Sequence, residues 1–385
     1  MSVNNHPLYN IHKTFLENLN DGPEFNGPIP ERTIPTPDQW INFLDHKVMS
    51  PIGAAACAVT MSKGITLLSK LGFDVLTYKT IRCAPFPAHP LPNIVFVDAT
   101  TTDCHQPVYA TETPNLDHIA LANSFGNAGP GLGHGAEFFY NDIKTAKASL
   151  LPGQILIVST YGTGKTAQEL TQDFVAAAQV AAQAGADAIE VNLSCPNIGD
   201  GKKLMYQDHE MVHMLMQHIA DAVKIPVIAK VGIFASQENL KEILLAIARA
   251  GGRGICGINS IPMPVLNADG TPAFGSEARR ISGVCGAPLR NFAVDFVRSA
   301  RKIIDQEKLA LTVSGVGGVT KPEHFAELLN AGANVALSAS GMMFNPYLAH
   351  EFHTCGRGAS CCVGGKLTAS PTDERTKAKQ SVIRR

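Results

Sequence analysis

The sequence has almost no excess of charge and no long hydrophobic run. Its 32 Lys and Arg residues nearly balance its 33 Asp and Glu residues, for a net charge of −1, so it lacks the basic bias of proteins that bind nucleic acid or anionic membranes. Its apolar runs fall short of the roughly 20 residues that span a bilayer, and no charged and then apolar leader opens the chain. We therefore expect a soluble, cytoplasmic protein with neither nucleic acid nor a membrane as partner.

The nine cysteines lack the pattern of a disulfide-stabilised protein. Their number is odd and they are scattered through apolar segments of a long chain, so most should be small buried hydrophobic residues. Cys355, Cys361 and Cys362 lie close together without the paired histidine spacing of a zinc site, which leaves a redox role open for them. No metal site is predicted. Cys195 differs from the others in the residues that surround it.

Composition divides the chain into three parts. Residues 1–44 are polar and rich in Pro, Asn and Glu, and are expected to form an N-terminal extension that wraps the body. Residues 45–353 alternate short β-branched runs with Ala- and Leu-rich helical segments, which is the pattern of βα units and a parallel sheet. Residues 354–385 are rich in Gly, Ser, Lys and Arg, and are expected to form a flexible tail.

Eight apolar runs in the middle part predict eight strands. Because nearly all their residues are apolar, both faces should be buried, as in a closed (β/α)8 TIM barrel of the α/β class. Two long excursions, residues 80–133 and 260–286, leave the carboxyl ends of strands, the rim where barrel active sites lie. The expected strands are 46–51, 74–79, 154–159, 187–193, 226–231, 254–259, 309–314 and 334–338, with helices at 165–183, 209–222, 236–250, 287–304 and 321–331.

Chemically useful side chains follow several of these strands. The run Asn192-Leu193-Ser194-Cys195-Pro196-Asn197 leaves the fourth strand, and a thiol there can remove a proton if its pKa is lowered or the site closes over it. Taken alone, a strand-end cysteine is more often a core residue. Its neighbours at the same rim therefore decide how it is interpreted.

Lysines and glycine loops at other strand ends indicate an anionic cofactor. Lys79-Thr80 ends the second strand, Lys230 lies in the fifth and Asn259-Ser260 ends the sixth, and a lysine buried there needs a polar or anionic partner. Glu190 is the carboxylate available for a simple ion pair; a bound anion is the alternative. Loops 314–318 and 338–341, after the seventh and eighth strands, have the glycine content and position of a phosphate site.

A set of carboxamides is expected to converge on the same rim. Asn123-Ser124-Phe125-Gly126-Asn127 ends the first excursion, and Asn192, Asn197 and Asn259 follow strands. Carboxamides offer paired donors and acceptors, which suit a flat ring with alternating C=O and N–H groups. Each asparagine could instead stabilise a turn, but the whole set favours a ligand site.

On these residues, above all the Asn-Leu-Ser-Cys-Pro-Asn run, the sequence resembles the dihydroorotate dehydrogenase family over residues 45–353. The cysteine in that run is typical of the class 1 enzymes. The resemblance implies FMN as cofactor and Cys195 as the base that takes the C5 proton of dihydroorotate while C6 delivers hydride to flavin N5. It also implies a homodimer, with fumarate as electron acceptor or with NAD reached through a separate electron-transfer subunit. The implied FMN contacts are Lys79, Thr80, Asn192, Lys230, Gly286, Gly317, Gly318, Ala339 and Ser340; the implied substrate contacts are Asn123, Ser124, Phe125, Gly126, Asn127, Asn197, Asn259 and Ser260.

Two other functions are compatible with the sequence. Residues 268–272 and 283–286 also resemble the dihydropyrimidine dehydrogenase barrel, which acts on uracil and thymine with the same cysteine. That relative has His after Cys-Pro, where this chain has Asn197, so the comparison favours dihydroorotate. The third reading is an inactive barrel that serves as a binding subunit, for which the excursions and the tail leave room.

Overall fold

The fold is built on a closed barrel of eight parallel strands. The computed structural model describes residues 7–84, 86–99, 103, 106–115, 118–125, 136–194 and 204–355. The barrel strands pair in the order β10-β11-β14-β15-β3-β4-β8-β9, and every pairing between them is parallel. The predicted TIM barrel is therefore confirmed. The strands are β3 (Ile52–Ala54), β4 (Val75–Ile81), β8 (Ile155–Thr160), β9 (Ala188–Asn192), β10 (Val227–Val231), β11 (Gly254–Gly257), β14 (Thr312–Val316) and β15 (Val335–Ser338).

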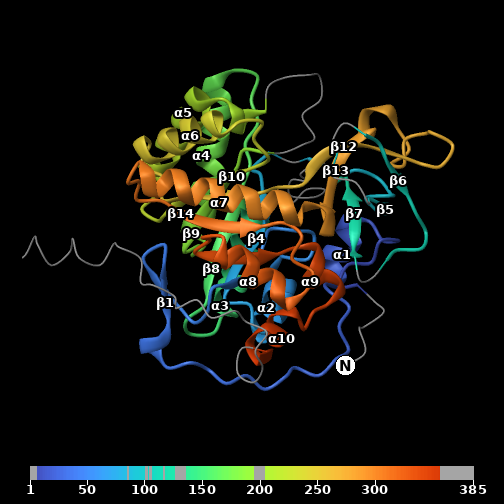
Figure 1. The fold of residues 1–385 in the computed structure, drawn as a ribbon, viewed down its shortest axis with the longest axis horizontal. Helices are drawn as coiled ribbons and strands as arrows, with labels where there is room; N and C mark the ends of the chain where they lie inside the picture. The colour runs from blue at the N-terminus through green and yellow to red at the C-terminus, as the bar shows by residue number, and fades with distance from the viewer. Residues whose placement is uncertain are drawn as a thin grey trace, which may run out of the picture.

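Helices follow the strands and cover the outside of the barrel (Figure 1). In α4 the buried residues Phe174, Ala177, Ala178 and Ala181 recur at helical spacing, while Thr166 caps the first turn by accepting a hydrogen bond from the Glu169 N–H. The helices are α2 (Ser62–Lys70), α3 (Ala136–Ala148), α4 (Ala167–Gln183), α5 (His209–Ala222), α6 (Gln237–Arg249), α7 (Arg290–Gln306), α8 (Pro322–Asn330), α9 (Ser340–Phe344) and α10 (Leu348–Cys355), with short 3-10 turns at Pro37–Gln39, Met205–Gln207, Glu277–Arg279 and Ala287–Leu289. Within the described residues, no helix is both long and apolar enough to cross a bilayer.

The first barrel strand lies later in the chain than the sequence predicted. Residues 46–51 were expected to form it, but β2 (His46–Val48) pairs with β1 (Ile41–Phe43) in an antiparallel hairpin, and β3 begins at Ile52. The hairpin buries Phe43 and Val48 in a cluster with Val75 and other barrel residues. The apolar residues of the hairpin are therefore explained by packing against the barrel. The strand β3 is a short Ile-Gly-Ala run with weak strand propensity, so little in the sequence indicated it.

The two excursions pair with each other in a second, smaller sheet. The strands β5 (Ile94–Asp98), β6 (Val108–Ala110), β7 (Ala120–Asn123), β12 (Ile261–Leu266) and β13 (Ile281–Gly286) close in the order β12-β13-β7-β5-β6. They gather beside the barrel at the right of Figure 1. Because β7 pairs with β13, some 160 residues away, no local pattern could indicate this sheet.

The N-terminal segment is anchored to the barrel by a buried ion pair. Asp74, whose side chain is 0% exposed, accepts two hydrogen bonds from Arg32 at 2.7 and 2.6 Å, one from Ser50 and one from Gln154. The planar guanidinium matches the carboxylate geometry, so both charges are satisfied away from water. This contact fixes residues around 32 against the start of β4.

Replacement of Arg32 by Ala should leave a buried carboxylate without its cation. We expect the free energy of unfolding to fall by about 3 kcal/mol, which urea denaturation measures. Arg298→Ala is the matched control, because Arg298 pairs with Asp295 at an exposed site, with side chains 65% and 73% exposed, and should change stability by less than about 0.5 kcal/mol. Equal effects of the two substitutions would contradict the assignment.

Candidate active site

A pocket lies at the carboxyl ends of the barrel strands. Its volume is about 1120 Å³, the open mouth included. It is lined by residues that leave the barrel strands and by residues of β5, β7 and β13 from the smaller sheet. The structure thereby collects in one place the predicted site residues Lys79, Thr80, Asn123, Phe125, Asn192, Lys230, Asn259, Ser260, Gly286, Gly317, Gly318, Ala339 and Ser340.

Lys79 and Thr80 lie where the pairing of β4 with β8 is irregular. The register shifts between Tyr78 and Ile81, and such irregularities redirect side chains near active sites. The Lys79 N–H donates to the Thr60 carbonyl at 2.8 Å, and its ammonium lies 5.4 Å from the centroid of the Phe125 ring, within cation–π range. The Thr80 hydroxyl is 3.0 Å from that of Ser159. The irregular pairing therefore directs two neighbouring side chains to the pocket.

A hydrogen-bonded network holds the carboxamides. The Asn192 amide donates to the Thr80 hydroxyl at 3.4 Å. The Asn259 amide donates to the Asn192 carbonyl oxygen at 3.3 Å and to the Ser194 hydroxyl at 3.0 Å. These bonds join the ends of β4, β9 and β11, so each amide is held in one orientation at the pocket wall.

A buried ion pair lies deeper in the pocket. Lys230 Nζ is 3.6 Å from Glu190 Oε2, with side chains 6% and 1% exposed. Burial alone lowers the pKa of Lys230, but the charge of the neighbouring Glu190 opposes this effect, and the pKa is raised overall. Burial raises the pKa of Cys256 well above its usual range, so its thiol is uncharged at neutral pH and Glu190 is the group that balances the ammonium. Lys230 therefore forms the ion pair with Glu190 that the sequence offered as one explanation of a buried lysine.

Asn123 and Ser124 point in different directions. The Asn123 amide donates to the Gly283 carbonyl at 3.1 Å and lies in the pocket wall. The Ser124 hydroxyl accepts from Arg279 Nε at 3.1 Å and lies 3.1 Å from His89 Nδ1, outside the set of pocket-lining residues. Burial, then the Arg279 charge, lowers the pKa of His89, so this histidine is neutral at pH 7. Ser124 thus holds the strand end in place from behind the pocket.

Three glycines let the backbone approach closely around the predicted phosphate loops. Gly286 and Gly318 have φ of +94° and +70°, which favours glycine. A Cβ on Gly318 would lie 2.5 Å from the Arg290 backbone, and one on Gly341 would lie 2.0 Å from the Val319 carbonyl oxygen. The narrow turns after β14 and β15 therefore depend on the absence of side chains.

Several lining residues were not singled out in the sequence. Ala55, Ala56, Cys57 and Ala58 follow β3, and the misplaced first strand hid them; their small size was the available signal. Cys285 of β13 also lines the pocket. Burial raises the pKa of Cys57 to about 11 and also raises that of Cys285, so both are protonated thiols at neutral pH.

Four predicted site residues lie outside the described residues: Cys195, Gly126, Asn127 and Asn197. The last described residue before Cys195 is Ser194, which is buried and bonded to Asn259 at the pocket wall.

The closed parallel barrel and the polar pocket at its strand ends define a TIM-barrel enzyme. The profile of the dihydroorotate dehydrogenase family matches residues 40–353. A dihydroorotate dehydrogenase of Dictyostelium discoideum is 37% identical over 364 residues, which cover 91% of this chain and 97% of that protein. The chain therefore belongs to the dihydroorotate dehydrogenase family, a family of oxidoreductases.

More distant relatives differ in the electron acceptor that their names state. The dihydroorotate dehydrogenase (quinone) of Rhodococcus erythropolis is 24% identical over 307 residues, covering 79% of this chain and 76% of that protein. The catalytic subunit of dihydroorotate dehydrogenase B (NAD(+)) of Bacillus pumilus is 26% identical over 264 residues, covering 67% and 76%. The names of these two relatives thus state different electron acceptors, a quinone and NAD.

Replacement of Glu190 by Gln keeps the side-chain shape but removes the charge that balances Lys230. We expect the free energy of unfolding at pH 7 to fall by about 3 kcal/mol, and a Glu190→Gln/Lys230→Met double variant to regain most of it. The deficit should shrink as pH rises towards 10, because the unfolded chain then also releases the lysine proton.

Urea denaturation of the ligand-free protein across pH measures these differences. The control is Glu277→Gln, at a side chain that is 74% exposed and pairs with Arg280, which should have little effect. If the loss in unfolding free energy of the double variant equalled the sum of the losses from Glu190→Gln and Lys230→Met, the two side chains would not be coupled.

Proposed function

We propose that this protein oxidises dihydroorotate to orotate in pyrimidine biosynthesis, with FMN as cofactor and a cysteine as base, as in the class 1 enzymes. One observation carries the proposal: in a chain of this family, a single pocket joins two lysines, a carboxamide network and glycine turns. The resemblance to class 1 further supports a cytoplasmic homodimer, with a possible electron-transfer subunit.

The lining residues fit FMN in charge and in shape. The charged residues of the described lining are two lysines, Lys79 and Lys230, and one carboxylate, Glu190. This composition suits an anionic ligand. The turns at Gly317-Gly318 and Ala339-Ser340, with Gly286 beside them, would hold the phosphate, and Lys79, Thr80, Asn192 and Lys230 would hold the ring system. When bound, FMN supplies the hydride acceptor at its N5 atom.

The carboxamides would bind and orient the substrate ring. Asn123, Asn192 and Asn259 line the pocket, and two of them are fixed by mutual hydrogen bonds, so their donors and acceptors are set before the ligand arrives. Ser260, Phe125 and, by resemblance, Gly126, Asn127 and Asn197 complete the proposed substrate contacts, while Ser124 supports them from behind the pocket wall. The ammonium groups of Lys79 and Lys230 would balance negative charge on the bound flavin.

Cys195 is the proposed base that removes the C5 proton. It directly follows Ser194, whose hydroxyl is bonded to Asn259 of the carboxamide network. General-base catalysis contributes a rate factor of about 10² to 10⁴. The remaining rate acceleration would come from orientation of the ring and from the charge of the lysines.

Replacement of Cys195 by Ala should lower kcat for dihydroorotate by about 10² to 10⁴ while the purified protein keeps its flavin, because only the proton transfer is lost. Cys195→Ser should retain part of the rate. The control is Cys355→Ala, at an exposed cysteine that should leave the rate unchanged. Anaerobic stopped-flow measurement of flavin bleaching separates this step from reoxidation, and an unchanged bleaching rate in Cys195→Ala would rule out the assigned base.

A substrate panel tests the choice of ring. Dihydroorotate should bleach the flavin under anaerobic conditions far faster than dihydrouracil or dihydrothymine. The opposite order would support the dihydropyrimidine dehydrogenase alternative. A colourless protein that cannot be reconstituted with FMN would instead support an inactive barrel. Steady-state assays of the active protein with fumarate, NAD and a quinone then identify the electron acceptor.

A further inference from the structure

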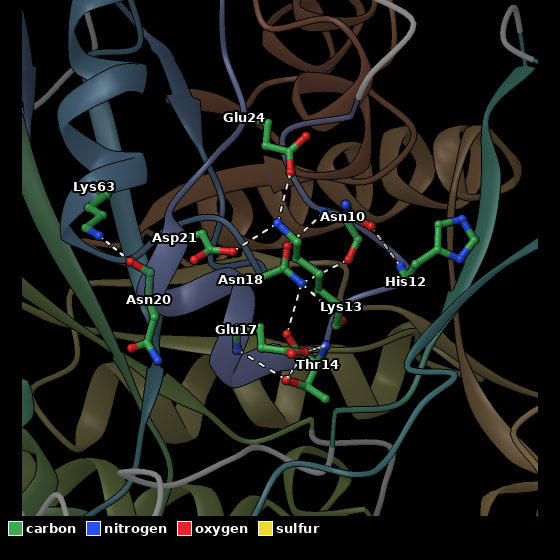
Figure 2. A network of polar contacts seen from close by, with 10 residues as sticks. All are labelled: Asn10, His12, Lys13, Thr14, Glu17, Asn18, Asn20, Asp21, Glu24 and Lys63. Carbon is green, nitrogen blue, oxygen red and sulfur yellow. Dashed lines mark hydrogen bonds and ion pairs between the residues drawn. The ribbon is translucent and has the colours of Figure 1, made fainter.

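Residues 7–22 form a folded unit on the barrel. The helix α1 (Phe15–Asp21) starts with a capping box in which Thr14 and Glu17 exchange hydrogen bonds. The Asn18 side chain donates to the carbonyls of Asn10, Lys13 and Thr14 and accepts from the Asn10 N–H at 2.8 Å (Figure 2). One buried carboxamide thus holds the turn and the helix together.

Charged contacts lie within this unit and join it to a barrel helix. Figure 2 shows Lys13 between Asp21 and Glu24, at 2.9 and 3.3 Å. Lys63 of α2 donates to the Asn20 carbonyl, so the unit is joined to a barrel helix. The segment is therefore fixed independently of its contacts with the pocket.

Two aromatic residues of the unit contact Phe125, which with Asn123 forms the part of the pocket proposed to bind substrate, called the substrate wall below. The rings of Tyr9 and Phe15 each lie 5.7 Å from that of Phe125, at interplanar angles of 81° and 59°. Such edge-to-face and tilted contacts are favourable beyond the area they bury. Phe125 lines the pocket and has the Lys79 ammonium on its ring, so the N-terminal unit helps to set the position of a pocket residue.

A third contact reaches a second pocket-lining residue, Met343. The Leu8 N–H donates to the Met343 carbonyl at 2.8 Å, and Leu8 is 2% exposed. Met343 lies in α9, directly after the Ala339-Ser340 turn, and lines the pocket. Leu8 and Tyr9 therefore join the substrate wall to the phosphate side of the same pocket.

We infer that residues 7–22 are a positioning element of the active site. Tyr9 and Phe15 hold Phe125 in place on the substrate wall, and Leu8 ties that wall to α9. The identity of the substrate in this inference rests on the proposed function. None of residues 7–22 lines the pocket, so the element acts on it through Phe125 and Met343.

Replacement of Tyr9 by Ala in the holoenzyme should raise KM for dihydroorotate about three- to tenfold and change kcat less than about twofold, because one ring contact to Phe125 is lost. Tyr9→Phe keeps the ring contact to Phe125 and should leave KM within about twofold of the wild-type value. Ile34→Ala, at a residue of the N-terminal extension that is 49% exposed, is the matched control. A fall in kcat with KM unchanged would overturn the inference.

A double-mutant cycle distinguishes positioning from simple structural support. In a Phe125→Leu background, Tyr9→Ala should add less than about twofold to KM, because its effect passes through the missing ring. Full additivity would overturn the inference. Should Tyr9→Ala not fold, Phe15→Leu removes the other ring contact at nearly constant volume and is expected to give the same pattern.

Hydrogen–deuterium exchange of the ligand-free protein tests the element without any substrate. Tyr9→Ala should speed exchange about threefold or more in residues 118–125 and 340–344, with 227–231 of β10 unchanged. Uniform acceleration throughout the barrel, or none at the two walls, would contradict the positioning role. A protein inactive on dihydroorotate but with this exchange pattern would overturn the proposed function alone.

Discussion

The parallel closure of the barrel is the constraint on which the site depends. Eight strands that all run in one direction bring their carboxyl ends to one rim, so side chains from distant parts of the sequence meet there. Thr80, Asn192 and Asn259 follow three different strands, yet they form one hydrogen-bonded network. The amides are thus oriented by the scaffold before any ligand binds, which reduces the entropy lost on binding.

The pocket contains two lysines, and each has a different neighbour for its ammonium group. An ammonium away from water needs a partner, and Lys230 has Glu190 at 3.6 Å, with Cys256 as an uncharged neighbour. Lys79 lies instead over the Phe125 ring. Lys230 is therefore paired with a carboxylate, while the ammonium of Lys79 lies against an aromatic part of the pocket wall.

The barrel and much of the pocket could be predicted because both depend on local signals. Doubly buried strands are recognisable as apolar runs, and polar residues at their ends mark the rim. The prediction failed at the first barrel strand: residues 46–48 do form a strand, but it pairs with β1 in an antiparallel hairpin outside the barrel, and the true barrel strand β3 has only three residues. That error also hid the small residues from Ala55 to Ala58 in the pocket wall.

The sequence by itself determined the class of fold, the order of the strands and the chemical types at their ends, because periodicity and residue type report local burial and local chemistry. Only the tertiary structure decided that β7 pairs with β13, that Ser124 turns to Arg279 behind the pocket, and that Tyr9 and Phe15 pack on Phe125. These contacts join surfaces far apart in the chain. Which surfaces meet depends on the shape of the whole folded body, and no window of sequence contains that information.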